Sequence, residues 1–246
     1  NLRIGGQNIC DDLTLNVKPG EVWSVLGRNG VGKTTLLHTL AGLRDPVGGQ
    51  IKLDGVALNS LAIKTRGQKV SILFQQAQAP ISTRAYDFVM SARHPWISRW
   101  AGPTRDDQNI VVESLSQMGL EALMHRDVGS LSGGERRRVE LAATVAQNAQ
   151  TILLDEPVNH LDLHYQINLL QGALKKWRAE GRAVVMVMHD LNLAIRFSDH
   201  LLCLCGDGST LQGETSAVAT TENLSTLLRY PLQELTFGDR SFFIPA

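Results

Sequence analysis

Four short apolar runs, rich in β-branched residues, dominate the hydrophobic pattern of the chain. They cover Val22–Leu26, Lys69–Phe74, Thr151–Leu154 and Ala183–Met188. Continuous apolar runs of this length are typical of strands in a parallel sheet, which are buried on both faces. Functional residues of such sheets gather beyond the carboxyl ends of the strands. The pattern therefore predicts an α/β fold with a site at that edge.

The segments between these runs follow other patterns. Residues 1–20 and Gly49–Leu58 combine short strand-like stretches with glycine turns, which predicts a small antiparallel sheet. Helical patterns dominate from about Pro80 to Leu131, for example over Asp106–Gly119. The end of the chain is expected to form a short helix near Glu222–Arg229 and a last strand at "SFFIP".

Length, composition and charge restrict the class of protein. The 246 residues, 43% of them hydrophobic, suit either one large domain or a domain with an inserted lobe. We predict one domain over 1–246, with an α/β core and antiparallel sheet over about 1–79 and 146–246 and a helical subdomain over about 80–145. The formal net charge of +0 argues against a general nucleic-acid binder. No apolar run reaches the ~18 residues of a membrane span and no signal peptide is recognised, so we expect a soluble, cytosolic chain.

The loop after Val22–Leu26 matches a phosphate-binding pattern in full. Residues 27–34 read GRNGVGKT, which fits GxxxxGK[ST] between a strand and a helix. The glycines let backbone N–H groups face phosphate oxygens, and the helix that follows adds its positive end. Lys33 is expected to reach the β- and γ-phosphates, and the Thr34 hydroxyl to bind Mg²⁺. The predicted ATP- and phosphate-binding residues are Gly27, Arg28, Asn29, Gly30, Val31, Gly32, Lys33, Thr34 and Thr35.

Two adjacent acids follow the run Thr151–Leu154. Asp155 is expected to hold Mg²⁺ through its water shell, and Glu156 to orient or deprotonate the attacking water. Two acids after a strand can also simply begin a turn. The phosphate loop in the same chain favours the catalytic interpretation.

Two further strands end in residues that suit the same chemistry. The amide of Gln75 can contact Mg²⁺ or the attacking water, although Gln76 and Gln78 are close alternatives. The imidazole of His189 can bind the γ-phosphate and orient the catalytic carboxylate; the alternative is a capping or core histidine. The predicted catalytic residues are Glu156, His189 and Gln75, and the predicted Mg²⁺ ligands are Thr34, Gln75 and Asp155.

The segment "LSGGE", Leu131–Glu135, is unusual for the start of a helix. Ser132 and Glu135 have the spacing of a capping box, which is a sufficient structural explanation for both. Gly133 and Gly134, however, are poor helix formers. They are expected where a phosphate must approach the backbone closely. Because the chain already has one phosphate loop, we predict that this second anion site serves the nucleotide of a neighbouring chain.

These motifs, GRNGVGKT, LSGGE, TILLDE and NHLD followed by His189, occur in the order found in ABC transporter ATPases, which the whole chain resembles. The resemblance implies a P-loop NTPase core with an antiparallel β subdomain and an inserted helical subdomain. It implies a head-to-tail dimer with two Mg²⁺-ATP molecules between the subunits. The segment LSGGE would be the family's signature, in which Ser132, Gly133, Gly134 and Glu135 contact the partner's ATP in trans, the first three at the γ-phosphate. Asp162 would lie at the dimer seam.

Weaker likenesses indicate a subgroup. The segments "SARHPWISRW", "HDLNLAIRFSDHLLCL" and "RSFFIP" are similar to those of ATPases that serve iron–siderophore, haem and vitamin B12 importers. This resemblance implies a polytopic permease, contacted by the loop that Gln75 begins, and a separate substrate-binding protein. It implies a peripheral location on the cytoplasmic side of the inner membrane and no nucleic-acid partner. The alternatives are a soluble, non-transport ABC ATPase and the ATPase subunit of another transporter type.

Three points remain open in the sequence. Pro95, Trp96 and Trp100 either shape a groove for a permease helix or fill the core of the helical lobe. The family usually has an adenine-stacking aromatic near the position of Ile4, so the nucleotide preference is not defined. His160 and His164 have the spacing of metal ligands on a helix, but the dimer-seam loop is the preferred interpretation.

Overall fold

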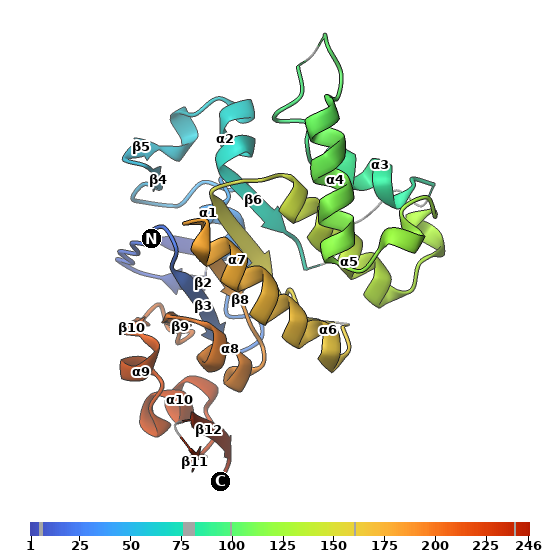
Figure 1. Cartoon of the computed structure of the whole chain (residues 1–246). Helices are drawn as coiled ribbons and strands as arrows, with labels where there is room; N and C mark the ends of the chain where they lie inside the picture. Colours follow the sequence, from blue (N-terminus) through green and yellow to red (C-terminus); the bar gives the residue numbers. More distant parts are fainter. Residues whose placement is uncertain (5–6, 76–81, 99, 160, 239) are drawn as a thin grey trace. The chain divides into compact units, whose positions relative to one another are not determined.

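A computed structural model of the chain (Figure 1) describes residues 1–4, 7–75, 82–98, 100–159, 161–238 and 240–246. The chain divides into two compact units. The first unit comprises Asn1–Ile51 and Leu174–Ala246, and the second comprises Lys52–Ala173. These units divide the chain after Ile51 and after Ala173. The subdomain boundaries expected near residues 80 and 145 concern a different division of the chain and remain a prediction.

Four neighbouring strands, in the order β10-β9-β3-β8, form the centre of the first unit. Strand β3 (Val22–Gly27) runs parallel to β8 (Ala183–Val187) on one side and to β9 (His200–Leu204) on the other. Strand β10 (Thr210–Glu214) pairs with β9 in antiparallel orientation. Every residue of β8 is buried, and β3 is buried up to its last residue. The prediction of buried parallel strands at Val22–Leu26 and Ala183–Met188 is confirmed.

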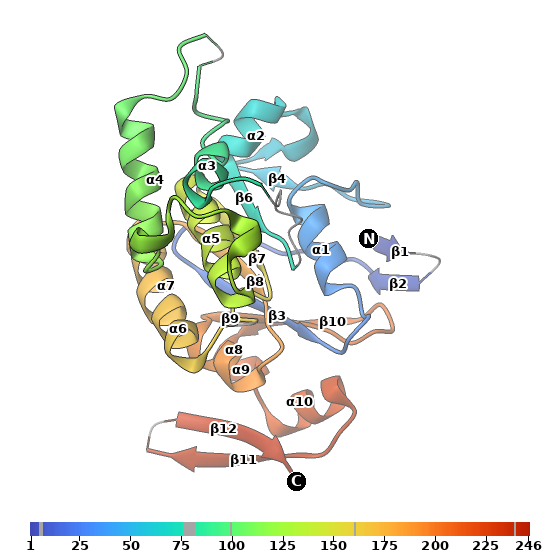
Figure 2. The same ribbon diagram turned by 90° about the vertical axis from the view of Figure 1, so that its right-hand side faces the viewer.

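Helices and two antiparallel hairpins complete the first unit. Helix α1 packs against β3 and β8, α7 against β8, and α8 against β3. The hairpin of β11 and β12 lies beside α10 in Figure 2. The predicted terminal strand, the helix near Glu222–Arg229 and the N-terminal antiparallel strands are confirmed. The helices are α1 (Lys33–Leu40), α7 (Leu174–Ala179), α8 (Leu191–Phe197), α9 (Thr215–Val218) and α10 (Thr221–Leu228), and the hairpin strands are β1 (Leu2–Ile4), β2 (Gln7–Cys10), β11 (Leu232–Phe237) and β12 (Arg240–Pro245).

The second unit contains a parallel strand pair and a group of helices. Strands β6 (Val70–Leu73) and β7 (Thr151–Asp155) pair in parallel, as predicted for both runs. Helices α3, α4 and α5 pack against one another. The other paired strands are the short antiparallel β4 (Lys52–Leu53) and β5 (Val56–Ala57). The helices are α2 (Ile63–Lys69), α3 (Ala85–Ser91), α4 (Arg105–Gln117), α5 (Gly133–Ala146) and α6 (Leu163–Asn168).

Local sequence signals explain where α4 and α5 begin and which way they face. A reciprocal capping box opens each helix, formed by Thr104 with Asp107 and by Ser132 with Glu135. On α4 the apolar side chains of Val111 and Leu115 are fully buried. The predicted helical segment therefore packs its apolar face, as its periodicity indicates.

The two tryptophans of "SARHPWISRW" do not fill the core of the second unit. The exposed fractions are 39% for Trp96 and 91% for Trp100. The indole nitrogen of Trp96 donates a hydrogen bond to the Gln147 carbonyl at 2.6 Å, and the Arg93 guanidinium lies over its ring. The core interpretation of these residues is wrong, because Trp96 is held at the surface by polar contacts. None of the helices within the described ranges combines the length and apolar character that crossing a membrane requires.

Candidate functional site

The phosphate loop connects β3 to α1 and curls around its own lysine. Gly30 and Gly32 have φ angles of 77° and 105°, in the left-handed region that favours glycine. The Lys33 side chain is buried, and its Nζ donates hydrogen bonds to the carbonyls of Gly27 at 2.8 Å and Arg28 at 3.0 Å. The N-cap residue of α1 is Gly32, which provides no side-chain cap, and the first turn has no acidic residue. The backbone N–H groups of this turn are therefore suited to binding an anion.

His189 lies at the same sheet edge as the phosphate loop. Strands β3 and β8 are parallel neighbours, with Val25 opposite Val187. The Met188 amide donates to the Val25 carbonyl at 3.3 Å, so the pairing continues to the residue before His189. The side chain of His189 is exposed. Within the first unit, the geometry thus brings the histidine and the end of β3 to one edge.

The second unit brings two other predicted residues into direct contact. Gln75 and Glu156 follow the parallel strands β6 and β7, in which Leu73 is opposite Leu154. The Gln75 amide Nε2 donates a hydrogen bond to Glu156 Oε1 at 3.0 Å. The side chains of Asp155 and Glu156 are almost completely buried at this edge. The alternatives Gln76 and Gln78 lie outside the described residues.

Asn159 is a functional candidate that the sequence analysis did not identify. Its Nδ2 donates a hydrogen bond to Glu156 Oε2, so both carboxylate oxygens of Glu156 accept a bond from an amide side chain. Glu156 itself has a φ of 51°, a strained conformation for a residue other than glycine. Such strain persists where the surroundings fix the backbone. Asn159 opens the NHLD segment, and its place three residues after the acid is the signal that could have identified it.

The start of α5 has the capping box predicted from "LSGGE". Ser132 N and Oγ both donate to Glu135 Oε2 at 2.8 Å, and Glu135 N donates back to Ser132 Oγ at 3.3 Å. Hydrogen bonds from the Ser132 amide and hydroxyl lower the pKa of Glu135. A Cβ added to Gly133 would have no neighbour within 4 Å. Packing within the described residues therefore does not explain this glycine, and the surface is open to a ligand.

The NHLD segment ends at the start of α6. The Asp162 carboxylate caps this helix by accepting a hydrogen bond from the Tyr165 amide at 3.0 Å, and it is exposed. His164 Nε2 shares a hydrogen bond with the Asn168 amide at 2.9 Å. Over the described ranges, no group of three or more histidine, cysteine or acidic residues is arranged to hold a metal. His160 and the side chain of Ile4 lie outside what the structure describes.

The predicted Mg²⁺ ligands have suitable chemistry. Thr34, Gln75 and Asp155 supply a hydroxyl, an amide and a carboxylate oxygen, and Mg²⁺ prefers oxygen ligands. Asp155 has a fully buried carboxylate at the end of β7. Magnesium ions in nucleotide sites keep several waters and phosphate oxygens, so few protein ligands are needed. Each of these side chains, taken by itself, therefore has the chemistry that a Mg²⁺-nucleotide needs.

The chain is similar to known proteins over most of its length. The family model described as "ABC transporter" matches residues 10–159. The petrobactin import ATP-binding protein FpuD of Bacillus anthracis is 36% identical over 94% of this chain and 85% of its own length. The hemin import ATP-binding protein HmuV of Pseudomonas fluorescens is 37% identical over 98% of this chain and 94% of its own.

A solved structure has the same fold. It is the dimeric, post-hydrolysis state of the ATP-binding cassette MJ0796 bound to ADP and Pi. It superposes with a TM-score of 0.76 at 29% identity, over 84% of this chain and 90% of that one. The α/β P-loop fold expected from the sequence is confirmed.

Proposed function

The chain belongs to the ABC transporter family and is an ATPase. From this premise we propose that it powers an importer of metal chelates. The cargo class is an iron–siderophore complex, haem or vitamin B12. Two relatives that match nearly the whole chain are import ATP-binding proteins, for petrobactin and for hemin. Their similarity supports an importer over an exporter or a soluble ABC ATPase.

The observation that carries the hydrolytic role is the hydrogen bond between Gln75 and Glu156. A buried carboxylate, held by amide donors on both oxygens, presents its remaining lone pairs in a fixed direction. Such a group can orient a water for attack on a phosphate and accept its proton. His189 is proposed to bind the γ-phosphate.

Nucleotide binding is assigned to the phosphate loop, residues 27–35. Its backbone N–H groups and the start of α1 bind the phosphates, and Lys33 exchanges its loop carbonyls for phosphate oxygens. Mg²⁺, when bound, neutralises phosphate charge, and Thr34, Gln75 and Asp155 would hold it.

A second copy of the chain is proposed to complete each site. The exposed Ser132 and Gly133, with Gly134, would contact the γ-phosphate bound by the partner, and Asp162 would lie at the seam. The dimeric ADP- and Pi-bound MJ0796 supports this assembly. ATP favours the closed dimer because only that state gives the nucleotide contacts from both subunits.

The cargo pathway is assigned to partner proteins. We propose a polytopic permease, contacted by the segment that Gln75 begins and by the exposed Trp96 and Trp100. A substrate-binding protein would deliver the chelate. The chain would be a peripheral protein on the cytoplasmic side of the inner membrane.

Uptake in the native cell tests this proposal. Cells carrying Glu156→Gln should lose uptake of one of three labelled chelates, a ferric siderophore, haem or cobalamin, while retaining the other two. The exposed Glu222→Gln change on α10 is the control and should leave uptake unaltered. In detergent extracts the tagged chain should co-purify with a polytopic membrane protein. Normal uptake of all three chelates together with no membrane partner would instead support a soluble ABC ATPase; loss of an efflux activity would support an exporter.

A further inference from the structure

A buried arginine on α5 contacts the backbone around the proposed catalytic acid. Arg137 is 4% exposed. Its Nη2 donates to the carbonyls of Asp155 at 2.6 Å and Glu156 at 2.9 Å. Its Nη1 donates to the Phe74 carbonyl at 2.6 Å and pairs with the Glu140 carboxylate at 2.8 Å. One guanidinium thus joins α5 to the ends of both β6 and β7.

These three carbonyls flank the pair formed by Gln75 and Glu156. Phe74 directly precedes Gln75, and Asp155 directly precedes Glu156. A guanidinium is planar and presents its N–H groups in fixed directions, so it restricts the positions of the carbonyls it binds. The bond to the Glu156 carbonyl also holds the residue that has a φ of 51°. Arg137 therefore restrains the backbone on which both side chains depend.

A second attachment lies at the other end of α5. Gln147 Nε2 donates to the carbonyl of Gly67, in α2, at 2.7 Å and to that of Val70, the first residue of β6, at 2.8 Å. Helix α5 is thus hydrogen-bonded to backbone carbonyls at both ends of β6. Because α5 begins at the signature glycines, the helix connects the signature to β6 as well as to the backbone of Glu156.

We propose that Arg137 is a positioning residue, which couples the signature helix to the water-orienting pair of Glu156 and Gln75. The inference rests on the proposed function, in which Glu156 orients water and the signature binds a neighbour's nucleotide. Contact of that nucleotide with the start of α5 is transmitted one helical turn along α5 to Arg137. Arg137 then sets the backbone of Glu156, so the acid reaches its productive position when the partner's ATP is engaged.

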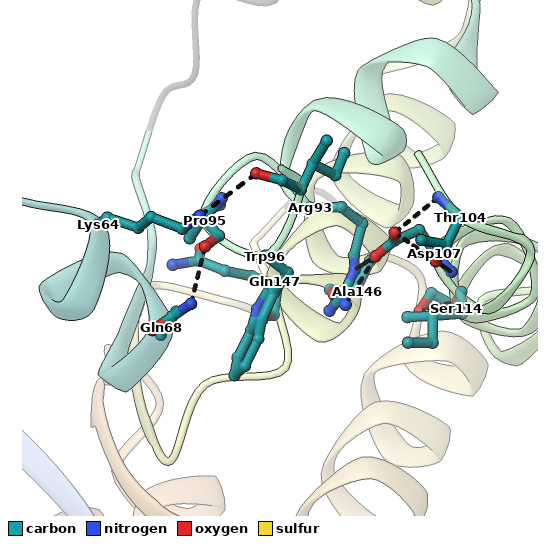
Figure 3. Close-up of polar contacts among 12 residues, drawn as sticks. Lys64, Gln68, Arg93, Pro95, Trp96, Thr104, Asp107, Ser114, Ala146 and Gln147 are labelled. Carbon is teal, nitrogen blue, oxygen red and sulfur yellow. Dashed lines mark hydrogen bonds and ion pairs between the residues drawn. The ribbon is translucent and has the colours of Figure 1, made fainter. Parts of the chain in front are cut away.

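The test must separate positioning from stability, since removal of one member of a buried ion pair leaves the other charge unpaired. We therefore replace both members, as Arg137→Met with Glu140→Gln. Arg93 and Asp107 provide the matched control (Figure 3). Their pair is buried to a similar degree in the same unit, with 2.9 Å between Arg93 Nη2 and Asp107 Oδ1. Arg93 Nη1 also donates to the Ala146 carbonyl at 2.9 Å, but within the described part of the chain the Arg93 guanidinium makes no hydrogen bond to residues 74, 155 or 156.

Steady-state ATP hydrolysis by the purified full-length chain is measured with thermal unfolding. The Arg137→Met/Glu140→Gln variant should lower kcat about 100-fold, the usual effect of a misplaced catalytic group, with KM for ATP within twofold of wild type. The Arg93→Met/Asp107→Asn control should lower the unfolding midpoint as much but keep kcat within twofold. An unchanged kcat in the first variant, or an equal loss in the control, overturns the inference.

A milder variant keeps the test decisive if the double replacement does not fold. Arg137→Lys retains the charge but lacks the planar fork, and should lower kcat about tenfold. Combined with Glu156→Gln, the same change should alter the residual rate by less than twofold, because Arg137 acts through Glu156. Losses that multiply in this combination would indicate a merely structural role and overturn the inference.

The outcomes also separate this inference from the proposed function. A Glu156→Gln variant that hydrolyses ATP at the wild-type rate removes the premise, and both fail together. A slow Glu156→Gln variant with a normal Arg137→Met/Glu140→Gln variant leaves the proposed function standing and rejects only the role of Arg137.

Discussion

Gly32, in the phosphate loop, is a position at which the structure predicts that any larger residue destabilises the folded chain. Its φ of 105° is unfavourable for any residue with a Cβ. An added Cβ would lie 2.6 Å from Ile9 Cδ1, 2.7 Å from Cγ1 and 2.8 Å from Cγ2. Ile9 is itself 2% exposed, so it has little space into which to move. Gly32→Ala therefore combines backbone strain with overpacking.

The magnitude follows from these two contributions. A left-handed backbone costs about 1–2 kcal/mol for a non-glycine residue. Overpacking a core side chain adds about 1–3 kcal/mol, which gives about 2–5 kcal/mol in total. Gly30→Ala is the matched control, because Gly30 has a φ of 77° with nothing within 4 Å of an added Cβ. It should lose only the backbone contribution of about 1–2 kcal/mol.

Denaturant unfolding of the nucleotide-free chain measures both changes. The clash with Ile9 should also appear as coupling: Gly32→Ala combined with Ile9→Ala should cost about 1–3 kcal/mol less than the sum of the single changes. If Gly32→Ala is no more destabilising than Gly30→Ala, or if the double variant is additive, the close contact with Ile9 does not determine the need for glycine here.

Three further results are expected. Lys33→Ala should weaken ATP binding in a fluorescence titration at least tenfold, and unaltered affinity contradicts its role. Folding lowers the pKa of Glu135 from its ordinary value of 4.5. The ionised carboxylate therefore stabilises the folded chain above pH 4.5, and this contribution is lost as the pH falls through the folded-state pKa. At pH 7 the free energy of unfolding of the wild type should exceed that of Glu135→Ala by about 0.5–1 kcal/mol, and in acid the two values should become equal. A difference that does not change with pH refutes this expectation. Asn159→Ala should lower kcat about tenfold with KM unchanged, and a change confined to KM would exclude a role at Glu156.

The strands and the edge where the site residues gather could be predicted from the sequence. Continuous apolar runs identify buried strands without tertiary information, and parallel pairing then brings Gln75 and Glu156 to the same edge. The capping box at Ser132 is likewise a local signal, since Ser132 and Glu135 are three residues apart.

The contacts of Arg137 could not be predicted in this way. Residues 136–138 are three consecutive arginines, which suggest a solvated charged face of a helix. Only the packing of α5 against β6 buries Arg137 against carbonyls that are 63 and 18 residues distant in sequence. Trp96 is the opposite case. A large aromatic residue suggests a core position, but Trp96 lies at the surface, where its indole donates a hydrogen bond to Gln147.

The most direct test of the central claim is the mass of the Glu156→Gln variant by sedimentation, with and without Mg²⁺-ATP. We expect a monomer without nucleotide or with ADP and a dimer with ATP, because slow hydrolysis preserves the γ-phosphate that both subunits bind. Adding Ser132→Arg to the same chain should abolish the dimer while leaving ATP binding intact. A chain that binds ATP but stays monomeric, or a dimer indifferent to Ser132→Arg, would contradict a nucleotide site completed by the partner's signature.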